Sequence, residues 1–342
     1  MVESHCIEVE GQKIGVRTGL AFIGRVVYLM AIPKADNVLL ASVNINRAVN
    51  WKGIVRKNEL HIGDRCVVFL PDSVLPEEEI YEFMKKYDYR VRMQRYRGER
   101  SECLIMPMWF DDGGIIEVGD DVTELLEVKK YEKPMPKVLC GNMLRRMPSF
   151  IPRTDEINYQ QMKDLSVFDK YGRSYYITEK LDGTSSTAYR WSGHFGVCSR
   201  NWELQEDEHN AYWKVANRYN LKELLPEGYA LQWETCGQGI QNNCLRIEGV
   251  DGFAFDVYDI AEGKYLTMKQ MLMFCSRLEF PVVKILKVGK AIDSKTLLND
   301  AREMSEGFYA SGVRREGVVV RSQRHLKGGR VSFKVLNIDY DN

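Results

Sequence analysis

The chain lacks an excess of charge of either sign, because its 342 residues include 48 Lys and Arg and 48 Asp and Glu. No global field therefore attracts a polyanion, and any surface that binds nucleic acid must be local. Apolar runs long enough to cross a membrane are also missing. The first residues, Met1-Val-Glu-Ser-His-Cys, lack the basic region and apolar run of a signal peptide. We therefore expect a soluble intracellular protein.

Paired cysteine motifs are absent as well. The eight cysteines are scattered at positions 6, 66, 103, 140, 198, 236, 244 and 275, without Cys-x-x-Cys spacing. No histidine spacing typical of a metal site accompanies them. This pattern argues against a disulfide framework and a zinc site, and it indicates reduced thiols in the cytoplasm or another reducing compartment.

The length predicts two domains. The first, residues 1–128, is expected to be mostly β, because short apolar or alternating runs are separated by Gly-Asp and Asp-Gly turns. These runs are Gly24–Ile32, Asn37–Val43, Cys66–Phe69 and Leu104–Met108. Their spacing favours a small OB-like β-barrel. One helix is expected over Pro76–Tyr87, because a proline and three glutamates begin that segment.

The second domain is expected at residues 141–342, after a charged, proline-containing linker at 129–140. Its apolar patterns predict a mixed α/β domain. Strands are expected near 174–180, 185–190, 228–234, 253–260 and 315–320, and helices near 206–225, 267–278 and 293–310. The chain as a whole is therefore predicted to be α+β.

Five arginines lie close together in the first domain. They are Arg90, Arg92, Arg95, Arg97 and Arg100, interleaved with Tyr89 and Tyr96. Alternating basic residues on one strand share a face and can follow a phosphate backbone. We therefore expect this segment to bind nucleic acid, and a solvated edge strand is the alternative.

The most informative segment is Thr178-Glu179-Lys180-Leu181-Asp182-Gly183, which contains Lys-x-Asp-Gly. A lysine attacks the α-phosphate of a nucleotide only as the neutral amine. We therefore expect the site to lower the pKa of Lys180 through partial burial and a nearby metal ion or other cation. Asp182 is suited to accept a hydrogen bond from a ribose hydroxyl, and Gly183 to allow a tight turn beside the nucleotide. The segment alone also fits a surface turn.

Five further residues follow in an order that suits the same chemistry. Arg200, in a Ser-Arg-Asn run, suits bidentate contact with phosphate oxygens. Glu234 and Glu316 lie at the ends of apolar strands, where a carboxylate can contact a sugar hydroxyl or hydrated Mg²⁺. The ring of Phe255 can stack on a purine, and Lys334, between apolar neighbours, can neutralise an α-phosphate. Each residue alone fits a structural role, but together they favour a nucleotide site.

This order of Lys, Arg, Glu, Phe, Glu and Lys resembles the covalent nucleotidyltransferases, and in particular the ATP-dependent RNA ligases related to RNA ligase 2. The resemblance implies that Lys180 is adenylylated and that Glu234, Glu316 and Lys334 take part in catalysis. It implies that Glu234 and Glu316 also hold the metal, through water. The implied nucleotide-binding residues are Glu179, Leu181, Asp182, Gly183, Arg200, Glu234, Phe255, Glu316 and Lys334. The segment Phe150–Glu156 also resembles a stretch that precedes the catalytic core in this family.

Domain order narrows the resemblance. DNA ligases and capping enzymes carry an OB domain after the last motif, whereas this sequence ends eight residues after Lys334, so we expect no such domain there. The β-rich domain comes first instead. Its segments Gly63–Pro76 and Arg97–Ser101 resemble the N-terminal OB domain of RNA ligases of the Deinococcus and Naegleria type.

Two positions depart from the family pattern. Leu336 stands where many relatives have a second lysine, and Trp233 stands where glycine is common. We therefore expect Lys334 to bind the α-phosphate alone or with Arg330.

The resemblance implies an RNA ligase with an ATP-grasp-like catalytic domain that uses ATP and Mg²⁺ or Mn²⁺. Its expected partner is RNA, as a nicked duplex in which the 3′-hydroxyl strand is RNA near the junction. No membrane partner is expected, and monomer is the default state. A DNA nick ligase and a GTP-dependent capping guanylyltransferase are alternatives that the domain order disfavours. A nucleic-acid-binding protein without catalysis is a third, which the retained Lys180 disfavours.

Overall fold

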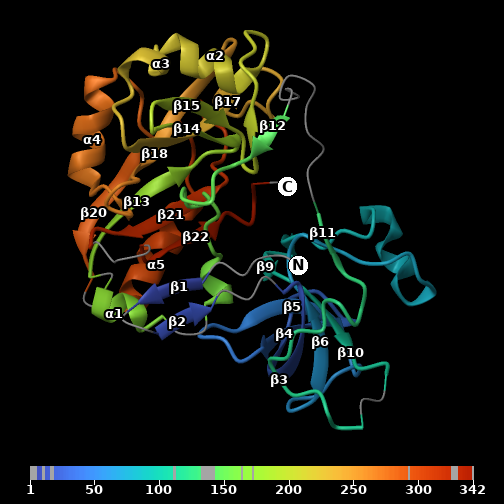
Figure 1. Cartoon of the computed structure of the whole chain (residues 1–342). Helices are drawn as coiled ribbons and strands as arrows, with labels where there is room; N and C mark the ends of the chain where they lie inside the picture. The colour runs from blue at the N-terminus through green and yellow to red at the C-terminus, as the bar shows by residue number, and fades with distance from the viewer. Residues whose placement is uncertain are drawn as a thin grey trace.

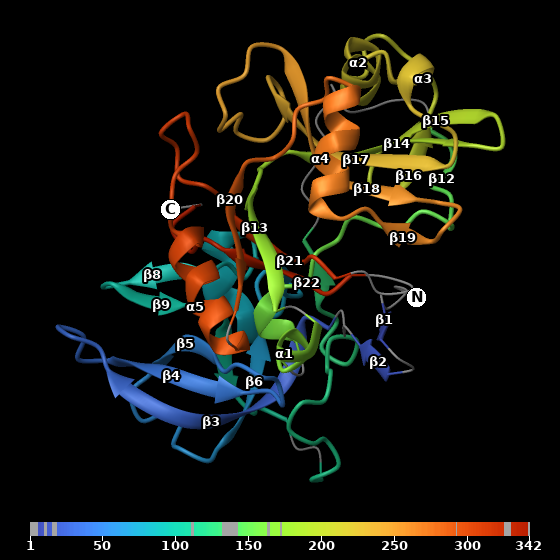
Figure 2. The same cartoon turned by 90° about the vertical axis from the view of Figure 1, so that its left-hand side faces the viewer.

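The computed structural model describes residues 6–9, 12–15, 19–110, 113–131, 143–162, 165–171, 173–291, 293–324 and 330–340. These residues form a β-rich N-terminal domain and a larger mixed α/β domain (Figures 1 and 2). The predicted α+β class, with an OB-like barrel first, is confirmed. Among the helices that the structure describes, none is long and apolar enough to cross a membrane.

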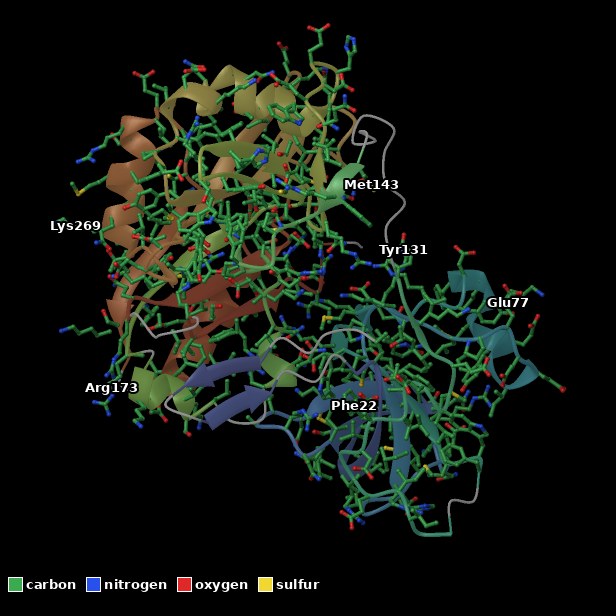
Figure 3. The ribbon with its side chains drawn as sticks, in the orientation of Figure 1. Phe22, Glu77, Tyr131, Met143, Arg173 and Lys269 are labelled. Atoms are coloured by element: carbon green, nitrogen blue, oxygen red, sulfur yellow. The ribbon has the colours of Figure 1, made fainter. Side chains whose placement is uncertain are left out.

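A five-stranded antiparallel sheet with the order β10-β6-β3-β4-β5 forms the N-terminal domain. Its strands are β3 (Ala21–Ala31), β4 (Val38–Asn44), β5 (Trp51–Arg56), β6 (Arg65–Phe69) and β10 (Leu104–Pro107). Buried side chains lie on both faces, and Phe22 is among them (Figure 3). Gly53 in β5 allows β10 to approach, because a Cβ there would lie 2.7 Å from Ile105 and 2.8 Å from the Cys103 carbonyl. The sheet therefore curls into a nearly closed barrel.

Smaller elements complete the N-terminal part of the chain. They are the β1–β2 hairpin (Cys6–Val9 and Gln12–Gly15), β7 (Ser73–Val74) paired with β11 (Lys129–Lys130), and the 3₁₀ helix η1 (Glu79–Tyr87). The predicted helix thus begins at Glu79 and not at Pro76. The first two residues of the predicted linker pair with β7, and residues 132–140 of it lie outside the described residues.

The prediction of a single basic strand over residues 90–100 is wrong. A short hairpin occupies this segment, formed by β8 (Gln94–Tyr96) and β9 (Glu99–Ser101). Arg97 and Gly98 make the turn, with φ angles of 50° and 89°. Both values lie in the left-handed region, which glycine adopts readily and which favours tight hairpin turns. The arginines therefore do not share one face of a strand.

A seven-stranded sheet with the order β12-β16-β15-β14-β17-β18-β19 forms half of the α/β domain. Its strands are β12 (Met143–Arg146), β14 (Thr184–Trp191), β15 (His194–Cys198), β16 (Trp202–Leu204), β17 (Tyr229–Gly237), β18 (Val250–Asp259) and β19 (Lys264–Tyr265). Helices α2 (Ala211–Arg218), α3 (Leu221–Leu224) and α4 (Met268–Arg277) cover one face and form the largest apolar core with it (Figure 2). The opposite face carries polar side chains, Glu234 among them, and the segment before β13 packs across part of it.

A four-stranded antiparallel sheet with the order β20-β13-β21-β22 forms the other half. Its strands are β13 (Ser174–Lys180), β20 (Ile285–Lys290), β21 (Gly317–Ser322) and β22 (Ser332–Leu336). Helices α1 (Val167–Tyr171) and α5 (Ser294–Ser305) and the 3₁₀ turn η3 (Tyr159–Gln161) pack on its outer face. The inner face carries Lys180 and Lys334. Tyr175 and Ile177 of β13 and Phe333 and Val335 of β22 point into the outer core, so the residues that alternate with them face the other way.

Candidate active site

The centre of the site is the ion pair between Lys180 and Glu316. Lys180 ends β13 and lies opposite Gly317, the residue after Glu316, in the β13–β21 register. The Lys180 Nζ is 2.6 Å from Glu316 Oε2, and the two side chains are 24% and 20% exposed. A nucleophile that is mostly enclosed yet reachable fits attack on a bound nucleotide.

A buried tyrosine joins the backbones of these two residues. The Tyr309 hydroxyl donates to the Lys180 carbonyl oxygen at 2.5 Å and accepts from the Glu316 amide at 3.0 Å. Burial raises the pKa of Tyr309, so its hydroxyl keeps the proton that it donates. Tyr309 therefore fixes the relative position of the lysine and the glutamate.

Glu234 approaches from the other sheet. It lies in β17 opposite Ser185 of β14, and Gly183 is packed against the same stretch of β17. A Cβ at Gly183 would overlap the Thr235 carbonyl and lie 2.8 Å from Glu234 Cγ. The glycine of the Lys-x-Asp-Gly segment is thus required for close approach of two backbones, which the predicted role in a tight turn did not include.

The predicted lowering of the Lys180 pKa, which relied on a nearby metal ion or other cation, does not hold for the protein without a ligand. Burial lowers the pKa of the amine, but the carboxylates of Glu316, Glu234 and Asp182 raise it, and the net direction is upward. The sequence places these carboxylates far apart in the chain, so their combined effect becomes visible only in the fold. Without a ligand, Lys180 is therefore held as the ammonium.

The pKa of the Glu234 carboxyl is also raised, so this group tends to stay neutral. Burial raises the pKa of its carboxyl to about 8, and the negative charges of Glu316 and Asp182 act in the same direction, while Lys180 lowers it. Three carboxylates close together cannot all ionise without a compensating charge. An added cation beside these carboxylates would therefore lower the pKa of Glu234.

Lys334 lies on the same inner face, in the strand next to β21. Its partner in the register is Val319, while its neighbours Phe333 and Val335 are buried in the outer core. Burial lowers the pKa of Lys334, and the positive charge of Lys180 lowers it further. The two lysines are therefore near neighbours on this face, as a shared candidate site requires.

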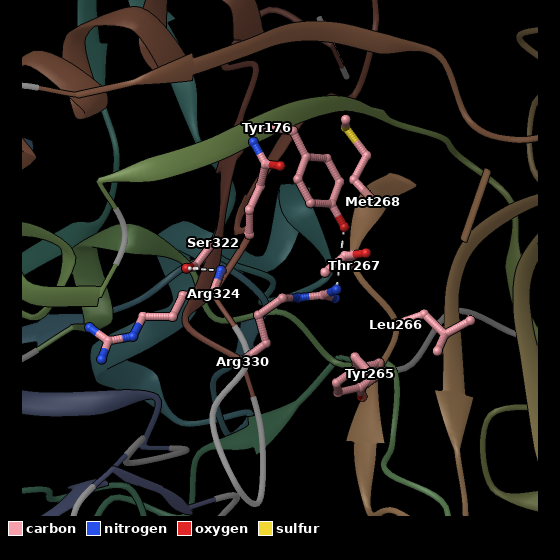
Figure 4. A pocket seen from close by; sticks show the side chains of 9 residues that line it. Tyr176, Tyr265, Leu266, Thr267, Met268, Ser322, Arg324 and Arg330 are labelled. Carbon is pink, nitrogen blue, oxygen red and sulfur yellow. Dashed lines mark hydrogen bonds between the residues drawn. The ribbon is translucent and has the colours of Figure 1, made fainter. Parts of the chain in front are cut away.

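Arg330, the other predicted phosphate ligand, binds a carboxylate of the protein instead. Its guanidinium forms a buried bidentate ion pair with Asp256, one bond of which is 2.6 Å long. It also donates to the Tyr176 hydroxyl at 3.3 Å, beside a small pocket that Tyr265 helps to line (Figure 4). Lys334 is thus left without Arg330 as a partner for phosphate.

The remaining motif residues lie around this centre. Phe255 and Leu181 pack together in an apolar cluster with Tyr309, and Phe255 is 9% exposed. Arg200 forms an ion pair with Asp155, which lies in the segment that precedes the core. That segment crosses the inner face, because Gln232 donates to the Pro152 carbonyl at 2.8 Å and Arg321 pairs with Glu156 at 3.3 Å.

The comparisons with known proteins agree with this geometry. Residues 173–336 match the family model for RNA ligase, and residues 20–108 match a model for an OB-fold domain. Naegleria gruberi RNA ligase with pyrophosphate has a similar structure, with a TM-score of 0.81 and 32% sequence identity over 95% of this chain and 98% of that chain. The chain belongs to the RNA ligase family.

Other solved structures of the Naegleria enzyme are similar as well. A lysine-to-alanine mutant with ATP and Mn gives a TM-score of 0.80 and 33% identity over 94% of this chain and 98% of that chain. A lysine-to-methionine mutant with AMP and Mn gives a TM-score of 0.80 and 33% identity over 94% of this chain and 97% of that chain. No match was found among curated protein sequences.

Two groups of predicted site residues do not join the centre of the ligase. Glu179 points to the opposite face of β13 from Lys180, and its carboxylate lies 3.3 Å from the Arg315 guanidinium. Arg90 pairs with Asp72 at 2.6 Å and lies over the Tyr131 ring. The hairpin arginines 95 and 100 pair with acids of the ligase domain. The role of Glu179 in binding nucleotide and the roles of these arginines in binding nucleic acid stay predictions.

Sequence analysis missed the residues that hold the motif residues in place. Tyr309 is one, and Tyr340 is another, since its hydroxyl donates to Asp182 Oδ2 at 2.6 Å. Asn337 is a third, because its amide donates to the Glu316 carbonyl at 2.9 Å. Sequence reasoning assigned a role to none of them, and only their hydrogen bonds to the motif residues identify them.

The carboxylates do not form a complete metal site by themselves. Within the part of the chain that the structure describes, no group of three or more His, Cys, Asp or Glu side chains is arranged to hold a metal ion. Burial and the neighbouring carboxylates raise the pKa of Glu234, so added positive charge would favour its ionised form. These residues fit a divalent ion that is bound through its water shell and through a nucleotide phosphate.

The raised pKa of Glu234 predicts a stability change for Glu234→Gln. Between about pH 4.5 and 8 the folded protein binds more protons at this site than the unfolded chain, so Glu234 destabilises the fold increasingly as the pH rises. In metal-free buffer at pH 9 we expect the variant to be more stable than the wild type by up to about 5 kcal/mol, the free energy that corresponds to a rise in pKa from 4.5 to about 8, with the difference disappearing near pH 4.5. Urea unfolding across this pH range measures it.

A matched control is Glu208→Gln, since the Glu208 side chain is 85% exposed. This variant should show no comparable change with pH. A Glu234→Gln difference that is the same at pH 5 and pH 9 would contradict the assigned protonation state.

Proposed function

We propose that this ligase joins 3′-hydroxyl and 5′-phosphate ends of RNA in three steps that use ATP. First, the neutral Lys180 Nζ bonds to the α-phosphorus of ATP, and the bond to pyrophosphate breaks. Next, the 5′-phosphate takes AMP from the lysine and becomes an adenylylated end. Finally, the 3′-oxygen attacks that 5′-phosphate, and AMP leaves. The observation that carries this proposal is the enclosed Lys180–Glu316 ion pair beside Glu234 and Lys334.

The choice of ATP rests on the family and on the relatives solved with ATP or AMP and Mn. Mg²⁺ or Mn²⁺ would supply positive charge at the α-phosphate, and the residues that fit it, through water, are Glu234 and Glu316. Lys334 is placed to contact the same phosphate, whose negative charge favours the protonated form of this lysine.

The residues around the nucleophile have separate tasks in this proposal. Tyr309 keeps Lys180 and Glu316 in register, so the amine stays aligned while the nucleotide binds. Phe255 offers an apolar wall suited to the purine, beside Leu181. Arg200 exchanges its ion pair with Asp155 for a phosphate group. Contacts within the free protein already hold each of these residues in place.

The proposed polynucleotide is a nicked duplex with RNA at the 3′-hydroxyl side. The N-terminal barrel is proposed to bind it next to the catalytic domain. Within the arginine group, Arg92 and Arg97 are exposed and have no acidic partner among the described residues, unlike Arg90, Arg95 and Arg100. Phosphate contacts are therefore assigned first to Arg92 and Arg97.

The lysine adenylate predicts a covalent label. Incubation of the pure protein with α-³²P-ATP and Mg²⁺ or Mn²⁺ should give label that survives a denaturing gel, because the phosphoramidate bond is covalent. Lys180→Ala should abolish the label, whereas Lys287→Ala, which changes a surface lysine in β20, should retain it. Label from α-³²P-GTP alone would move the protein to the capping class, and no label under either metal would overturn the proposal.

Substrate choice is tested with nicked duplexes that differ only in the sugar of the 3′-terminal nucleotide. We expect a 3′-ribonucleotide end to be sealed at least ~10-fold faster than a 3′-deoxynucleotide end, since a site that hydrogen-bonds the 2′-hydroxyl loses that bond in DNA. Equal sealing rates would contradict RNA specificity. Faster sealing of the all-DNA nick would support the DNA ligase alternative.

A further inference from the structure

The β8–β9 hairpin of the N-terminal domain touches the ligase domain at two acids. Arg95 Nε is 2.5 Å from Asp339 Oδ1, and Arg95 and Arg100 both pair with Glu306 at the end of α5. The Arg95 and Asp339 side chains are 33% and 19% exposed. Arg95 thus forms its ion pairs within the protein, and one of them is with the turn that follows β22.

This turn, residues 337–340, is tied to the backbone of Glu316. Asn337 is buried, its amide donates to the Glu316 carbonyl at 2.9 Å, and its side chain donates to the Arg315 carbonyl at 2.9 Å. The side-chain oxygen of Asn337 accepts from the Asp339 amide at 3.0 Å. The position of Asp339 is therefore linked to that of Glu316 by consecutive hydrogen bonds.

The last described residue of the turn reaches the lysine segment. The Tyr340 hydroxyl is 2.6 Å from Asp182 Oδ2 and 2.8 Å from Cys244 Sγ. Burial raises the pKa of Tyr340, and the Asp182 carboxylate raises it further, so the hydroxyl remains a donor to Asp182. Asp182 lies two residues after Lys180, and its charge acts on that amine.

We propose that Arg95, Asp339 and Tyr340 are positioning residues for lysine adenylylation, through which the N-terminal domain orients Asp182 beside Lys180. The proposal rests on the lysine adenylate described above. It gives the β8–β9 hairpin a role in the first chemical step, before any polynucleotide binds. None of the three residues is assigned to contact the nucleotide itself.

The size of the expected effect follows from the kind of contact. Ion pairs that are one-third exposed contribute little to folding stability. A misplaced group in a reactive site, however, can cost about 100-fold in rate for a displacement of 1 Å. The three residues should thus affect the rate constant of adenylylation more than the stability of the fold.

The test is the single-turnover rate of Lys180 adenylylation by α-³²P-ATP, measured without RNA over a range of ATP concentrations. We expect Tyr340→Phe to lower the maximal rate about 10- to 100-fold with little change in the ATP concentration for half-maximal rate. Arg95→Ala should lower the maximal rate about 3- to 10-fold, and Arg95→Lys, which keeps the charge, should restore part of it.

Two further measurements separate positioning from a general loss of structure. The double variant Arg95→Ala/Tyr340→Phe should be no slower than Tyr340→Phe alone, because both changes interrupt one series of contacts. Salt should slow the wild type through screening of the Arg95–Asp339 pair, and it should slow Arg95→Ala less. Arg218→Ala, which breaks an Arg–Asp pair on α2, is the matched control and should leave the rate unchanged.

Each failure has a distinct meaning. Wild-type rates for Tyr340→Phe, or independent multiplication of the Arg95 and Tyr340 effects, would overturn the positioning role. A wild-type protein that takes no label would instead overturn the proposed lysine adenylate. Thermal melting of every variant shows whether a lost rate reflects an unfolded protein. If a variant is unfolded, the rate of the milder Arg95→Lys variant and the salt dependence of the wild-type rate test the positioning role instead.

Discussion

The ion pair of Lys180 with Glu316 is the interaction on which the rest of the site depends. It places a nucleophilic amine among carboxylates, which raise the pKa of Lys180 above its ordinary value. Burial raises the pKa of Glu234, and the neighbouring carboxylates raise it further. In the free protein the Lys180 side chain is therefore unreactive, since an ammonium group cannot attack a phosphate. Added positive charge near Glu234 and Glu316 relieves the repulsion between carboxylates and weakens their hold on the lysine proton.

The fold builds this arrangement from two sheets that each bury one face in an apolar core. Helices α2, α3 and α4 cover the larger sheet, and α1 and α5 cover the smaller one, so polar side chains collect on the two inner faces. Glu234 comes from the larger sheet, while Lys180 and Lys334 come from the smaller one. A buried network around Asp256 and Arg330 ties the sheets together and keeps their spacing fixed.

Local patterns in the sequence predicted several of the elements and pointed to the candidate site residues. The predicted strand over 174–180 and the predicted helix near 267–278 agree with β13 and α4, because their apolar periods are regular. Lys180 was identified by the Lys-x-Asp-Gly segment, and Glu316 as a carboxylate directly before an apolar strand. The direction of the Lys180 pKa shift, the role of Tyr309 and the β8–β9 hairpin were not predictable, since each depends on groups far apart in the chain.

The most direct measurement is the pKa of the Lys180 amine in the free ligase, from the ¹³Cε chemical shift of ¹³C-lysine-labelled protein, with the signal identified by its loss in Lys180→Arg. The wild type should titrate above 10.5, the ordinary value for lysine, and Glu316→Gln should titrate at a lower pH than the wild type. A wild-type value below 10.5, or a Glu316→Gln value equal to that of the wild type, would contradict the carboxylate cluster as the element that controls the nucleophile.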